Sequence, residues 1–162
     1  MTNLYTLITK MMAYEDGCVE RVNHFLKVFA FAQTIAAGEG LDRETQDILE
    51  AAAVTHDIGI RVCFEKYGQC DGPKQEQEGP PIAAAMLPAC GYTPAQCARV
   101  CYLIGHHHTY TDVDGADYQI LIEADFLVNI FENGLTHEAV TKVRDNIFKT
   151  KTGKKLLTDL YL

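Results

Sequence analysis

Histidines and aspartates on apolar helical stripes are the residues best suited to chemistry. His24 shares a helix face with Val28 and Ile35, four and eleven residues later, so its side chain is expected to point into the core. His56 ends a second apolar stripe, and Asp57 follows it directly. A single inward histidine is more often structural than a ligand. These positions therefore indicate a metal site only if further ligands converge on them.

Asp125 is the least expected residue on an apolar stripe. Leu121 and Val128 flank it at helical offsets, and an ionised carboxylate in apolar surroundings costs free energy unless it is paired or bound to a metal. A salt bridge to Arg21 or Arg99 is one solution. A metal ion shared with the inward histidines is the other, and the presence of two such histidines favours it.

His24, His56, Asp57 and Asp125 together offer two imidazoles and two carboxylates. This mixed nitrogen and oxygen set suits iron, manganese, zinc or nickel and leaves coordination positions open for water, as a catalytic site requires. Cysteine ligands are not expected, because no two of the six cysteines form a Cys-x-x-Cys pair. We expect the cysteines to be free thiols.

Three consecutive histidines extend another apolar stripe. His107 lies seven residues after Val100 and three after Ile104, so it is expected to point inward. His106 and His107 are candidates for contact with a metal or substrate, and His108 is a weaker one. The alternative is that these histidines are solvated or stabilise a helix carboxyl end.

Other charged residues are candidates for binding substrate or a second ion. Arg21 lies one turn before His24, and its guanidinium could bind phosphate oxygens. Glu76 and Glu78 could supply carboxylates from a neighbouring loop, although such residues are usually solvated. His137 lies outside any apolar stripe, and we expect it on the surface.

Apolar spacing is helical almost throughout, which predicts an all-α bundle formed by one domain of residues 1–162. Thr93 to Gln96 is typical of a helix start, with a capping box and a proline at the first position. Helices are predicted near residues 2–13, 18–37, 42–57, 61–67, 77–89, 94–107, 116–132 and 136–149, with another near the carboxyl end. The stretch from Gly68 to Pro81 is predicted to be a loop that could close over the site as a lid.

The composition excludes several function classes. A net charge of −8 argues against long nucleic acid as a partner. No apolar run approaches the roughly 18 residues that a membrane span needs. Residues 1–12 lack the pattern of a secretion signal, so a cytoplasmic location is expected. The sequence leaves the oligomeric state open.

The order of the chemical residues resembles the HD-domain superfamily of metal-dependent phosphohydrolases. The resemblance rests on His24, the His56-Asp57 doublet, the histidine cluster and Asp125, over roughly residues 20 to 132. It implies a helical HD-type fold in which those first three residues and Asp125 hold one metal. It also implies that the later histidines bind a second ion or the phosphate.

Two departures from the family pattern bear on metal number. Ile60 stands where many members have a basic residue, and residues 58–105 contain no histidine. We therefore expect one tightly bound divalent transition metal, with a second ion weak or absent. The Gly-Tyr-Pro extension of cyclic-dinucleotide phosphodiesterases does not follow the histidine cluster, which disfavours that substrate class.

These observations predict hydrolysis of a small phosphate ester, such as a nucleotide or a phosphomonoester, by metal-activated water. Asp57 would be the catalytic residue that orients or deprotonates this water. Two alternatives remain open: an iron-dependent oxygenase of a related helical fold, and a non-catalytic regulatory module that binds a metal or nucleotide. Bound iron without phosphatase activity would favour the first, and nucleotide retention without turnover the second.

Overall fold

The computed structural model describes residues 2–162. These residues form helices joined by turns and loops, and they contain no strand. The prediction of an all-α bundle is confirmed. The elements are α1 (Leu4–Tyr14), α2 (Val19–Glu39), α3 (Arg43–Thr55), α4 (Ile60–Tyr67), α5 (Gly72–Met86), the short 3-10 helix η1 (Leu87–Cys90), α6 (Pro94–Ile104), α7 (Ala116–Glu132), α8 (His137–Asn146) and α9 (Lys151–Tyr161).

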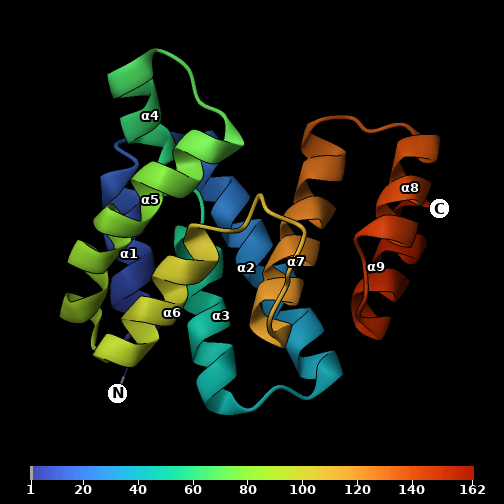
Figure 1. Cartoon of the computed structure of the whole chain (residues 1–162), viewed down its shortest axis with the longest axis horizontal. Coiled ribbons are helices and arrows are strands. Elements are labelled where there is room, and N and C mark those ends of the chain that lie inside the picture. The colour runs from blue at the N-terminus through green and yellow to red at the C-terminus, as the bar shows by residue number, and fades with distance from the viewer. Residues whose placement is uncertain (1) are drawn as a thin grey trace.

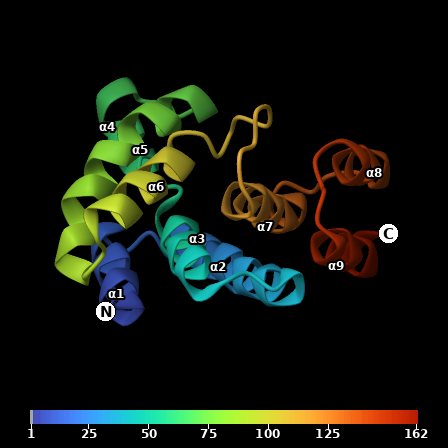
Figure 2. The ribbon, with the colours of Figure 1, turned by 60° about the horizontal axis from the view of Figure 1, so that its bottom comes forward.

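Helices α2, α3 and α7 pack against one another at the centre of the molecule (Figure 1). On one side of them lie α1, α4, α5 and α6, while α8 and α9 lie on the other side, beyond α7. Figure 2 shows the same arrangement from a second direction. Helix α2 carries His24, α7 carries Asp125, and the turn that follows α3 carries the His56-Asp57 doublet, so the core packing itself brings these residues together.

Local signals explain where several helices begin. Thr93 and Gln96 form the predicted capping box at the start of α6. Asp42 caps α3 by accepting a hydrogen bond from the backbone N–H of Thr45 at 2.9 Å. The buried faces of the helices contribute more to the stability of the fold than these caps do, because apolar side chains such as Val28 on α2 are fully removed from solvent.

The predicted loop from Gly68 to Pro81 is wrong, because α5 begins at Gly72 within it. Asp71 caps this helix by accepting from the backbone N–H of Lys74 at 2.9 Å. Two prolines, Pro80 and Pro81, lie inside the helix. An interior proline costs about 3 kcal/mol, so packing against neighbouring elements must offset it. The segment is a packed helix, which removes the basis for the proposed lid.

A close contact between two glycines holds α5 in place. A Cβ atom on Gly59 would lie 2.8 Å from the backbone nitrogen of Gly79 and 2.9 Å from the carbonyl oxygen of Gln75. A Cβ on Gly79 would lie 2.7 Å from the Ile104 side chain. Only glycine lets the backbones approach this closely. The contact fixes α5 beside the turn that carries the His-Asp doublet.

Two of the helices that end earlier than predicted, α3 and α6, precede the histidine segments. The sequence predicted helices through residues 57 and 107, but α3 ends at Thr55 and α6 at Ile104. Both histidine segments therefore lie in turns at helix carboxyl ends. His56 Nδ1 donates to the carbonyl of Ala53 at 2.8 Å, and His107 Nδ1 donates to the carbonyl of Ile104 at 2.7 Å. Each histidine satisfies a carbonyl that the helix end leaves without a partner.

The described residues also show the state of the cysteines and whether any helix could span a membrane. All six cysteines are free thiols, as predicted. Within residues 2–162, no helix combines the length and apolar character that crossing a bilayer requires.

Candidate metal centre

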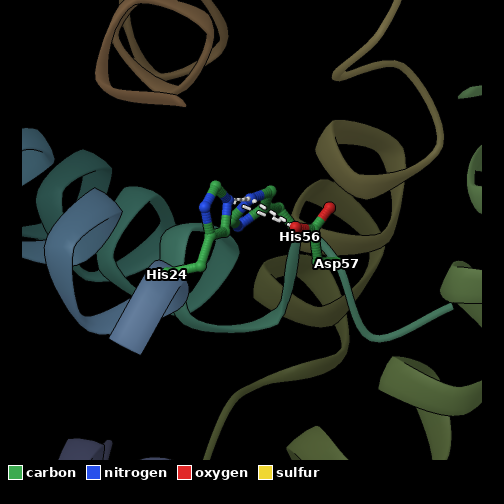
Figure 3. Close-up of side chains that lie close together, drawn as sticks. All are labelled: His24, His56 and Asp57. Atoms are coloured by element: carbon green, nitrogen blue, oxygen red, sulfur yellow. Dashed lines mark hydrogen bonds and ion pairs between the residues drawn. The ribbon is translucent and has the colours of Figure 1, made fainter. Parts of the chain in front are cut away.

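Four side chains from α2, α7 and the turn after α3 converge on one point. His24 Nε2 lies 3.1 Å from His56 Nε2, 3.1 Å from Asp125 Oδ1 and 3.2 Å from Asp57 Oδ2. His56 Nε2 lies 3.3 Å from Asp57 Oδ2 and 3.4 Å from Asp125 Oδ1. Figure 3 shows His24, His56 and Asp57 pointing toward one another. The structure thus brings together the four residues that the sequence singled out as ligands.

The salt-bridge alternative for Asp125 is wrong for both arginines considered. Arg21 donates from Nε to Glu15. Arg99 bonds two other aspartates, Asp114 and Asp117. Asp125 is only 5% exposed and faces His24 and His56 instead. A buried carboxylate needs a positive charge beside it, and here that charge must come from the histidine cluster or from an ion held with it.

Hydrogen bonds on the far side of each ring fix which nitrogen faces the cluster. His24 Nδ1 lies 2.9 Å from Glu132 Oε2, and His56 Nδ1 lies 2.8 Å from the carbonyl oxygen of Ala53. Both partners accept hydrogen bonds, so each Nδ1 carries the proton and a neutral ring turns the lone pair of Nε2 inward. Two such lone pairs 3.1 Å apart repel each other. A metal cation between them and the carboxylates resolves this conflict, so these residues fit a metal.

The pKa values of the cluster reflect the same demand for positive charge. Burial opposes protonation of His56, but the charge of Asp57 and the hydrogen bond with Asp125 outweigh it and raise the pKa of His56 well above its usual value. Burial would raise the pKa of Asp57, but His56 and His107 hold that pKa well below its usual value. The carboxylates are therefore ionised and stabilise a cation, either a proton on imidazole or a metal.

A second group of ligands adjoins the first. The ligand atoms of Asp57, His107 and His108 all lie within 4.8 Å of one another. His107 Nε2 is buried, lies 3.5 Å from Asp57 Oδ1 and has no hydrogen-bond partner among the described residues. The sequence ranked His108 below its neighbours because a continuous helix was assumed. The early end of α6 turns His108 toward the site instead.

Two sequence candidates lie away from both groups. His106 donates from Nδ1 to the carbonyl of Tyr102 at 2.7 Å, and its ring stacks on Tyr102 at a centroid distance of 4.0 Å. Glu78 accepts hydrogen bonds from Lys66 and Tyr67 on α4. Neither residue is placed to bind a metal in either group.

The remaining candidates lie at or beside the site. Glu76 Oε1 accepts from the backbone N–H of His108 and from Thr109 Oγ1, each at 2.9 Å, so it positions the histidine segment. Arg21 lines a cleft of about 360 Å³ that also exposes His24 and Asp57. The cleft gives a small molecule access to the candidate metal centre.

Glu132 is a site residue that the sequence analysis missed. One of its oxygens accepts from His24 Nδ1, and the other accepts from Lys27 Nζ at 2.7 Å. A carboxylate in this position fixes the orientation of a ligand histidine and makes it a stronger ligand. The available signal was spacing, because Glu132 lies seven residues after Asp125 and thus on the same face of α7.

Comparison with known proteins shows the family to which the chain belongs. Residues 21–140 match the model of the HD domain. The chain belongs to the HD domain family. Its resemblance to that family, first drawn from the order of these histidines and aspartates, is confirmed over a span that includes α2, the His-Asp doublet, the histidine segment and α7. Membership of the HD domain family supports assignment of this chain to a superfamily of metal-dependent hydrolases.

A solved structure shows the same fold. It is the crystal structure of a predicted HD superfamily hydrolase from an uncultured Thermotogales bacterium. The alignment has 25% sequence identity and a TM-score of 0.66, and covers 98% of this chain and 83% of that chain. No curated protein matches the chain by sequence.

We expect Glu132→Ala to weaken metal binding by about tenfold to a hundredfold, because His24 would lose the partner that orients it. The dissociation constant for Mn²⁺ would be measured by competition with a coloured chelator. Glu138→Ala makes the same change on the exposed face of α8 and serves as the matched control. Equal affinities in the two variants would contradict the positioning role of Glu132.

The metal-free protein should lose stability as the pH rises above about 6.5, the ordinary pKa of histidine. His24 and His56 have raised pKa values in the folded state, so their stabilising contribution is complete at lower pH and is lost as they deprotonate. Thermal unfolding in the presence of a chelator measures this. His56→Gln should make the melting temperature depend less on pH. A melting temperature that rises with pH in the wild type would refute it.

Proposed function

We propose that this protein is a metal-dependent phosphohydrolase that cleaves a small phosphate ester, such as a nucleotide or a phosphomonoester. The supporting observation is that the Nε2 atoms of His24 and His56 each lie within 3.4 Å of an oxygen of Asp57 and of Asp125, at a cleft that Arg21 also lines. Imidazole lone pairs, ionised carboxylates and a guanidinium form a site that suits both a metal and a phosphate.

In this proposal the four residues hold one divalent transition metal, either iron, manganese, zinc or nickel. Their two imidazoles and two carboxylates form the mixed ligand set that these metals accept. When bound, the metal supplies a Lewis acid that polarises the phosphoryl group and makes water a stronger nucleophile near neutral pH.

Asp57 is proposed as the catalytic residue. Its Oδ2 faces His24 and His56, while its Oδ1 faces His107. Because its pKa lies well below the usual value, it is ionised and accepts hydrogen bonds but is a weak base. Orientation of the attacking water by Asp57 is therefore favoured over its deprotonation by Asp57.

Arg21 is proposed to bind the phosphate. Its Nε is held by Glu15, which is almost fully buried, so the guanidinium is fixed at the edge of the cleft. The remaining N–H groups of a guanidinium match the oxygens of a phosphate. This places a fixed cation near the metal ligands and counters the charge of the substrate.

Purified protein should hydrolyse a phosphomonoester or nucleotide only when a divalent transition metal is present. Release of phosphate would be measured after chelation and after addition of iron, manganese, zinc or nickel. His56→Ala should abolish turnover, whereas His137→Ala, on an exposed position of α8, should remain close to wild type. Chelator-insensitive turnover would contradict the proposal. Bound iron without any phosphatase activity would instead support the oxygenase alternative.

We expect one tightly held metal ion per chain. The first group contains His24, His56 and Asp57, and Asp125 Oδ1 joins it at 3.1 Å from His24 Nε2 and 3.4 Å from His56 Nε2. The second group has only His107, His108 and a share of Asp57. Metal analysis after extensive dialysis should give about one ion for the wild type and for His107→Ala, and none for Asp125→Ala. A content near two ions that falls to one in His107→Ala would establish a two-metal site and overturn this expectation.

A further inference from the structure

The cleft at the metal centre continues into a second hollow on the same face. The cleft is about 360 Å³ and the adjoining hollow about 660 Å³, and both are lined by Glu20, Glu132 and Asn133. Asn23 and Lys27 complete the second hollow. These volumes are typical of small-molecule sites. A substrate with its phosphate at the metal centre would extend its organic group along this path.

The charges along this path disfavour further phosphates. Glu20 and Glu132 contribute carboxylates to both hollows. The cation of the adjoining hollow already has an anionic partner, since Lys27 Nζ lies 2.7 Å from Glu132. A second or third phosphate would thus face carboxylates and compete with Glu132 for Lys27. Juxtaposed like charges are a common way for a site to reject a ligand.

Neutral amides provide the polar contacts along the same path. Asn129 and Asn133 line the cleft, and Asn23 and Asn133 line the adjoining hollow. Asn23 Nδ2 donates to the carbonyl of Val19, which directs its other amide atom to accept from a ligand. Amides donate and accept hydrogen bonds without charge, so they suit hydroxyl groups or a nucleobase.

We infer that the substrate is a monophosphate ester of a neutral, hydrogen-bonding organic group, and that di- and triphosphates are disfavoured. This inference rests on the proposed function and specifies its substrate class. The single phosphate lies between the metal ligands and Arg21, and the organic group contacts the asparagines. Nucleoside monophosphates and sugar monophosphates share this chemistry.

Binding to the metal-loaded protein tests the inference without requiring turnover. Isothermal titration would compare adenosine 5′-phosphonate, glucose phosphonate and a non-hydrolysable adenosine triphosphate analogue, with free Mn²⁺ held equal. At least one monophosphonate should bind tenfold or more tightly than the triphosphate analogue. Tighter binding of the adenosine or the glucose compound would identify the organic group. Equal or tighter binding of the triphosphate analogue, or no binding of either monophosphonate, would overturn the inference.

A charge reversal at Glu20 provides a second test of the inference. Glu20→Lys should improve binding of the triphosphate analogue relative to the monophosphonate by about tenfold, because it replaces a repelling carboxylate with a cation. Glu138→Lys makes the same change on α8 and should leave that ratio unchanged. An unchanged ratio in Glu20→Lys would also count against the inference. A failure of turnover on every phosphate ester would refute the proposed function, while the order of binding would still decide whether the cleft prefers a monophosphate ligand.

Discussion

The structure depends on the placement of positive charge between two imidazole nitrogens and two carboxylates in the interior. Asp125 and His56 are almost fully removed from solvent, so water cannot solvate their charge or lone pairs. Protons on the histidines can supply the charge, but a divalent ion supplies more of it and removes the repulsion between the ring nitrogens. The central packing of α2, α3 and α7 is what forces these groups to meet.

A carboxylate in the core does not by itself indicate a metal. Glu123 lies two residues before Asp125 on α7 and is fully buried. It accepts hydrogen bonds from Thr150 Oγ1 at 2.7 Å and from Gln119 Nε2 at 2.9 Å, and burial raises its pKa. Neutral donors thus satisfy Glu123 and join α9 to α7. Asp125 differs because histidines face it, so the two buried acids of one helix have different roles.

Helical periodicity was enough to predict that His24, His56 and Asp125 point inward, because the inward face of a helix is set by spacing alone. Asp57 was predicted because it directly follows His56 and through the resemblance to the HD-domain superfamily. His24 and Asp125 could be placed from their apolar neighbours without knowledge of the fold. The start of α5 at Gly72, five residues before the predicted helix, could not be predicted, since it depends on the contact of Gly59 with Gly79 and on the cap at Asp71. The orientation of His108 was missed for a related reason, because the end of α6 lies within the apolar stripe that predicted its continuation.

The hydrogen bonds from His56 and His107 to helix carbonyls link ligand chemistry to backbone dynamics. Each ring joins the last turn of a helix, α3 or α6, through its Nδ1 and presents its Nε2 to the site. Any event that immobilises Nε2 also restrains that turn, and fraying of the turn displaces the ring. Occupancy of the site is therefore coupled to local unfolding at two helix ends. Slower amide hydrogen exchange at these ends would be the physical signature of a loaded site.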